Sequence, residues 1–82
     1  MNPIEPKPEI LARLEEETEA LRIVARDRFL EYRDAFHAFR EGSIRRAKLD
    51  AARNAYGLAE KAFKQSFERV RDLDALIRLY RR

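Results

Sequence analysis

Apolar residues recur at helical spacing over two long stretches of the chain. The first stretch repeats every three or four residues, at Leu11, Leu14, Thr18, Leu21, Ala25, Phe29, Tyr32, Phe36 and Phe39. The second repeats in the same way, at Leu49, Ala52, Tyr56, Ala59, Phe63, Ser66, Val70, Leu73, Ile77 and Tyr80. At about 100° of rotation per residue, each set forms one stripe along a helix. The pattern therefore predicts two amphipathic helices, the second unbroken across Gly57.

Proline and glycine predict where these helices begin and end. All three prolines fall in the first eight residues, where they favour an extended lead-in. Gly42 is suited to ending one helix and Ser43 to capping the next. A connection this short forces the helices to run antiparallel. We therefore expect an all-α fold, an antiparallel two-helix hairpin that is coiled-coil-like. Its parts are a Pro-rich lead-in over 1–8 and one domain over 9–82, with helices at about 9–41 and 44–80 and a turn at 42–43.

Charge divides unevenly between the two predicted helices. Residues 1–41 carry 7 Lys+Arg against 10 Asp+Glu, and residues 42–82 carry 11 against 5. Pairing residues about the turn sets Leu21 near Phe63 and Leu14 near Val70. The same register brings acidic side chains of the first helix beside basic ones of the second, namely Glu15, Glu16, Glu17 and Glu19 beside Lys64, Arg69 and Arg71. We therefore expect the two helices to neutralise each other.

The apolar surface is wider than one helix–helix seam can bury. The second helix extends its stripe on one side, and the first carries a separate strip on its far side. These additional positions form the predicted oligomer or partner interface: Ile23, Leu30, Ala51, Ala55, Leu58, Ala62 and Leu76. Because the core of a lone hairpin is marginal, the pattern favours a homodimer that forms a four-helix bundle. Burial against an unrelated protein and a bent monomer are the alternatives.

Catalytic and metal-binding chemistry have few candidate residues. The chain has no cysteine, no Gly-rich phosphate loop and no combination of nucleophile, base and orienting group. We expect neither an enzyme nor a cofactor. Glu31, Asp34 and His37 resemble part of the Glu-x-x-His unit of di-iron bundles, but the chain has one histidine and it lies off the main stripe. They are the candidate ligands of a metal-binding alternative.

A basic tip is predicted at the turn, formed by Arg40, Arg45, Arg46 and Lys48. Arg45 and Arg46 fall in the first turn of the second helix, where the helix dipole disfavours cations. This placement opposes local stability and suggests that the tip binds a phosphate or a partner's carboxylates. A solvated turn without a ligand is the alternative interpretation.

Taken as a whole, the pattern is typical of a non-enzymatic protein–protein interaction module: an adaptor, chaperone, regulator or assembly component. The first alternative is a nucleic-acid-binding module that uses the basic tip. The second is a dimeric helical metal-binding protein. The chain has neither an apolar run of about 20 residues nor the pattern of a secretory signal. We therefore expect a cytoplasmic protein without membrane contact.

Overall fold

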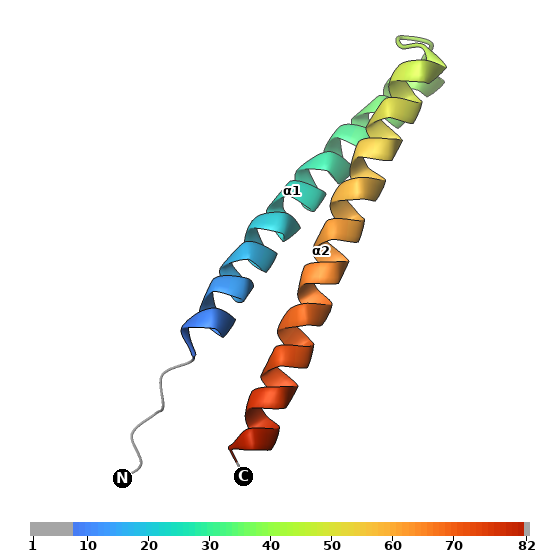
Figure 1. Ribbon diagram of the computed structural model, residues 1–82. Coiled ribbons are helices and arrows are strands. Elements are labelled where there is room, and N and C mark those ends of the chain that lie inside the picture. Colours follow the sequence, from blue (N-terminus) through green and yellow to red (C-terminus); the bar gives the residue numbers. More distant parts are fainter. Residues whose placement is uncertain (1–7, 82) are drawn as a thin grey trace.

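The computed structural model describes residues 8–81, and in this range it consists of two helices that lie side by side and run in opposite directions (Figure 1). Helix α1 spans Glu9–Arg40 and helix α2 spans Arg46–Tyr80. No strand occurs among the described residues. The molecule is a rod with extents of 64 × 20 × 15 Å. The predicted all-α hairpin is confirmed, while the lead-in predicted for residues 1–8 lies outside the described residues except for Pro8.

The turn between the helices begins as predicted and ends later than predicted. Gly42 has a positive φ of +79°. Its N–H donates to the carbonyl oxygen of Phe39 at 3.0 Å, and the N–H of Ser43 donates to the carbonyl oxygen of Ala38 at 2.8 Å. These two bonds form a Schellman motif, which closes a helix end. Ser43 is therefore part of the end of α1. The prediction that it caps α2 is wrong, because the N-cap of α2 is Arg45.

The seam between the helices follows a seven-residue repeat. Leu11, Thr18 and Ala25, each seven residues apart, are the buried residues of α1. Ser66 is the buried residue of α2, and its hydroxyl lies 2.5 Å from that of Thr18. The spacing of the three buried positions of α1 is that of a coiled-coil seam, and α2 places Ser66 against the middle one. The Thr18–Ser66 pair has the register that was predicted for Leu21 with Phe63.

Three aromatic positions assigned to the seam differ from the prediction. Phe29 and Phe36 are 45% and 42% exposed, and Tyr80 is 84% exposed. Because the buried line repeats every seven residues from Leu11, the two phenylalanines fall at its edge. Tyr80 lies beyond the N-terminal end of α1, since the Thr18–Ser66 register places Glu9, the first residue of α1, level with position 75 of α2. The aromatic side chains are therefore partly a surface feature.

Several charged side chains form ion pairs within their own helix. Among the described residues, Glu19 pairs with Arg22 at 2.7 Å and Glu60 pairs with Lys64 at 2.6 Å. Both pairs lie within one helix, at the spacing of three or four residues that brings side chains on a helix surface together. These exposed pairs contribute little to stability.

Candidate functional site

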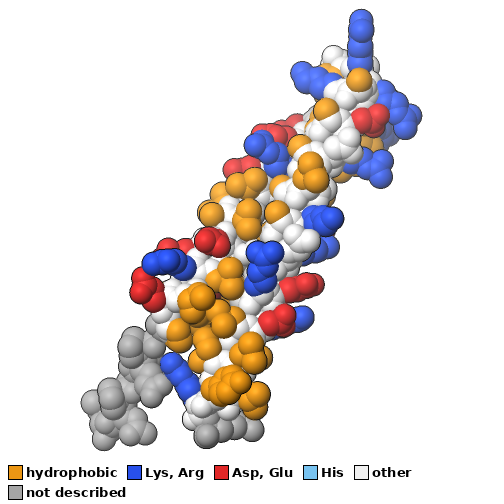
Figure 2. All heavy atoms as spheres, in the orientation of Figure 1, with side chains coloured by type: hydrophobic (Ala, Val, Ile, Leu, Met, Phe, Trp, Pro, Cys, Tyr) orange, Lys and Arg blue, Asp and Glu red, His pale blue; other side chains and the backbone are white. Residues whose placement is uncertain are grey.

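A continuous groove runs along one side of the hairpin between α1 and α2. Its apolar wall consists of residues from both helices, and we call it the aromatic groove: Ala25, Phe29, Tyr56, Phe63, Phe67 and Val70. The hollows that compose it extend along α2 from Tyr56 to Arg78, about 33 Å at 1.5 Å per residue. Figure 2 shows hydrophobic side chains gathered on the surface of the rod. A groove of this length matches a helix better than a small molecule.

Ring contacts order the aromatic groove. The Phe29 ring meets the Tyr56 ring edge-on, with ring centres 5.4 Å apart. The Tyr32 ring also contacts Tyr56, in a stacked arrangement with ring centres 6.1 Å apart. Further along α2, the rings of Phe63 and Phe67 lie 6.1 Å apart. Phe67 is nevertheless 53% exposed, so about half of this residue faces solvent.

Polar side chains of Tyr56, Glu60 and Lys64 form a chain along the edge of the groove on α2. The Tyr56 hydroxyl donates to the Glu60 carboxylate, and this bond raises the pKa of Tyr56. Lys64 donates to the same carboxylate, and with Tyr56 it lowers the pKa of Glu60. On α1, the guanidinium of Arg22 binds both oxygens of Glu19 and lowers the pKa of that carboxyl. Glu19 and Glu60 beside the groove are thus each paired with a cation on their own helix.

The groove is electrically balanced. Ten charged residues line it, five acidic and five basic: Glu15, Glu19, Glu60, Glu68, Asp74, Arg22, Arg26, Lys64, Arg71 and Arg78. A surface that binds a polyanion carries excess positive charge. The aromatic groove has no excess of positive charge. It therefore suits a partner surface that has an apolar centre and carries charges of both signs around it.

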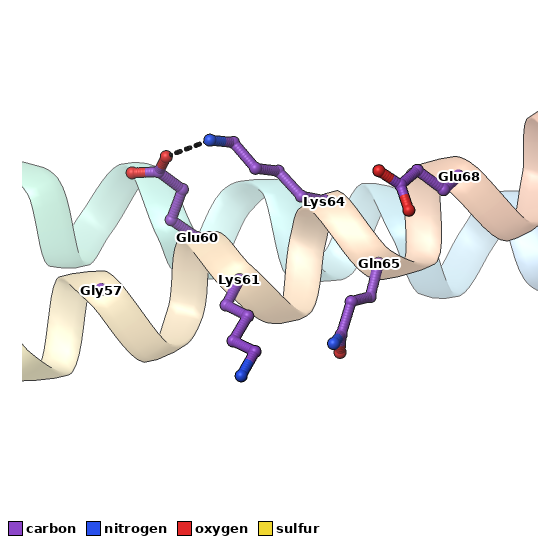
Figure 3. Close-up of a pocket in the computed structure, with 6 residues that line it drawn as sticks. All are labelled: Gly57, Glu60, Lys61, Lys64, Gln65 and Glu68. Atoms are coloured by element: carbon purple, nitrogen blue, oxygen red, sulfur yellow. Dashed lines mark ion pairs between the residues drawn. The ribbon is translucent and has the colours of Figure 1, made fainter.

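A second hollow lies above Gly57, and all of its lining residues belong to α2 (Figure 3). Glu60, Lys61, Lys64 and Gln65 surround a space that the missing glycine side chain leaves open. The hollow is therefore a gap on the surface of one helix. It lacks an arrangement of converging groups on which catalysis would depend.

The predicted interface residues separate into two groups. Around the axis of α2, Leu58 and Leu76 lie about 80° from Ser66 in one direction. The groove residues Phe63 and Tyr56 lie about 60–80° from Ser66 in the opposite direction. Ile23 lies about 140° from Thr18, on the outer surface of α1. We call the α2 group the alanine flank: Ala51, Ala55, Leu58, Ala62 and Leu76. Leu58, Leu76 and Ala51 are exposed, while Ala55 and Ala62, like Leu30 on α1, are half-buried.

Sequence reasoning did not single out Phe67. The aromatic pair Phe63 and Phe67, one helical turn apart, widens the stripe of α2 toward the groove. A strict seven-residue count from Leu14, through positions 21 and 28, also places Phe29 one position away from the seam. These two signals together would have indicated an apolar surface on this side.

The basic tip is present at the end of the rod that holds the turn, where Figure 2 shows several Lys and Arg side chains. Arg40, Arg45, Arg46 and Lys48 are all exposed. Arg40 lies over the Phe36 ring at 5.9 Å, and Arg46 is 3.9 Å from Asp50. The first turn of α2 contains no acidic residue. The tip therefore presents its positive charge to solvent.

The candidate metal ligands do not come together. Glu31 accepts two hydrogen bonds from Arg28 at 2.8 and 2.9 Å, Asp34 pairs with Arg33, and the His37 ring packs beside Phe36. Among residues 8–81, no group of three or more His, Asp or Glu side chains is arranged to hold a metal ion. One described hairpin thus offers no metal centre.

Comparison with known proteins gave no match to a family model, to a curated protein or to a solved structure. Within the described residues, neither helix is sufficiently apolar to cross a lipid bilayer.

Proposed function

We propose that this chain is a non-enzymatic protein–protein interaction module that acts as an adaptor, chaperone, regulator or assembly component. One observation carries the proposal. Among the described residues the buried apolar side chains are Leu11 and Ala25, and no large side chain is fully buried. Leu58, Leu76 and Phe67 are meanwhile more than half exposed. A hairpin with so small a core gains stability by covering its outer surfaces.

Two outer surfaces serve this function. Self-association into a four-helix bundle covers one side of the rod, and a different protein binds the other. The alanine flank suits the second role, because Ala51, Ala55 and Ala62 permit a close approach of a partner helix while Leu58 and Leu76 supply apolar area. Ile23 and Leu30 add a smaller apolar strip on α1.

Affinity capture from the native host tests the alanine flank. The wild-type protein should retain its partner, and a Leu58→Glu/Leu76→Glu variant should lose it because two carboxylates are introduced into an apolar contact. Ala20→Glu is the matched control, since Ala20 is exposed on α1, about 200° from Thr18. Capture that is equally strong with the double variant would contradict the assignment of this flank.

The exposed basic tip favours nucleic-acid binding as a second candidate function. Four cations beside an uncapped helix N-terminus can contact phosphates. A gel shift should then weaken steeply with salt, with a slope of log affinity against log salt near −3 to −4 for about four phosphate contacts. Arg45→Gln/Arg46→Gln should reduce this slope by about half. Absence of a shift at low salt would exclude this candidate.

A further inference from the structure

We propose that the aromatic groove is the surface on which a second copy of this chain docks. The inference rests on the proposed self-association and names the face that it uses. This face is distinct from the alanine flank, which stays available for a different protein.

The exposed area of the chain exceeds what its mass requires. A compact monomer of 9.8 kDa exposes about 5,200 Å², so the 7080 Å² of this chain are about 1,900 Å² in excess. A standard protein interface removes about 800 Å² from each partner. One docked copy is therefore enough to account for a large part of the excess.

Apolar side chains along the groove are placed for helix packing. Phe29 and Phe67 lie at the edges of the seam, one on each helix. Phe63 lies between them on the groove wall, and Val70 extends the wall beyond Phe67. A second hairpin laid along this side converts both edges into interior positions. The result is a four-helix bundle in which the aromatic rings form the central layers.

Charge selects a second copy as the occupant. The five carboxylates and five cations along the groove cancel within one hairpin. A two-fold dimer presents the same face to itself, so each protomer meets a face that is equally balanced. A polyanion or a strongly basic partner would gain no net electrostatic attraction from this face, because its attraction to one set of charges is offset by repulsion from the other.

Sedimentation equilibrium of two variants tests the face. The wild-type protein should behave as a dimer, with twice the 9.8 kDa mass. Phe67→Glu should weaken dimerisation about 100-fold, because it places a carboxylate in the centre of the contact. Leu58→Glu, a matched control on the same helix at a side chain that is 71% exposed, should leave the dimer intact. Circular dichroism should show both variants to be helical.

A substitution that keeps the apolar surface gives an independent measurement. The chain has no tryptophan, so Phe67→Trp supplies one fluorophore in the groove and Leu58→Trp supplies one outside it. Emission from the Phe67→Trp variant should shift to shorter wavelength as concentration rises through the dimerisation range. Emission from the Leu58→Trp variant should stay at the wavelength of exposed indole.

Three results would overturn the inference. They are a monomeric wild-type protein at millimolar concentration, an intact Phe67→Glu dimer, and indole emission that responds to concentration at position 58 and not at 67. Loss of partner capture by the alanine-flank variant with an unchanged dimer would leave the groove assignment standing. Partner binding at the alanine flank and dimerisation through the aromatic groove can therefore be contradicted independently.

Discussion

The Ser66 hydroxyl donates a hydrogen bond of 2.5 Å to the Thr18 hydroxyl oxygen across the seam. The direction follows from the other bond of Thr18, whose single proton is donated to the Leu14 carbonyl at 2.8 Å. Both side chains are buried, and no buried side-chain polar atom among the described residues lacks a partner. A slip of one heptad would place Thr18 opposite Ala59 or Leu73 and leave its hydroxyl without Ser66. The pair thus favours one register of the hairpin.

Removal of this pair should lower stability in a coupled way. Ser66→Ala should reduce the free energy of unfolding by about 1 kcal/mol, since it removes the hydrogen bond across the seam. Thr18→Val should reduce it by about 1–2 kcal/mol, since it also removes the bond to the Leu14 carbonyl. The double variant should lose less than the sum of the two, by about 1 kcal/mol. Urea unfolding of the four proteins measures this coupling. Strictly additive losses would show that the bond does not contribute.

The two glycines should respond oppositely to alanine. A Cβ at Gly57 meets no atom within 4 Å, so Gly57→Ala should raise the free energy of unfolding by about 0.5–1 kcal/mol through helix propensity. Gly42→Ala should lower it by about 1 kcal/mol, because φ +79° strains an L-residue. Thermal or urea unfolding gives both values. A loss of stability in Gly57→Ala would indicate a contact at this point on α2.

The position of the α2 cap can be tested by substitution. Arg45 has φ −82° and ψ 155°, the conformation of an N-cap residue, but it makes no side-chain cap bond. Arg45→Asp should therefore stabilise the fold by about 1 kcal/mol, through a cap bond and the favourable dipole. Ser43→Ala should change stability little, because Ser43 contributes its backbone N–H to the end of α1. A loss of stability in Ser43→Ala, with no gain in Arg45→Asp, would instead indicate that Ser43 caps α2.

Acid should remove the contribution of Glu60. Its pKa is lowered from 4.5 by Lys64 first and Tyr56 second. A carboxylate whose pKa is lowered by folding stabilises the folded state at pH values above its unfolded-state pKa. This stabilisation is lost as the pH falls through the folded-state pKa. Glu60→Gln should therefore have a lower Tm than wild type at pH 7, and the difference should disappear well below pH 4.5. Melting curves across this pH range measure the difference in Tm, and the control Glu68→Gln should not show it.

Candidate sites differed in how far the sequence could predict them. The basic tip follows from chain order alone, because residues on both sides of a tight turn must meet there. The sequence divided the predicted interface set into a strip on each helix, and Ile23 and Leu58 lie on different sides of the rod. Phe67 was missed because stripe patterns describe one helix at a time. A groove belongs to two helices, and its edges depend on how they are rotated against each other.

Local physics in the sequence determined the two helices, the Gly42 stop, the antiparallel direction and the register of the seam. Helical spacing fixes which residues share a face, and a short turn permits one direction. The tertiary structure decided which edge of each stripe remains uncovered. One seam buries only a narrow arc, and an α-helix drifts about 20° per heptad relative to a strict seven-residue repeat. Packing resolves this drift by placing Thr18 and Ser66 inside and leaving Phe29, Phe36 and Phe67 at the surface.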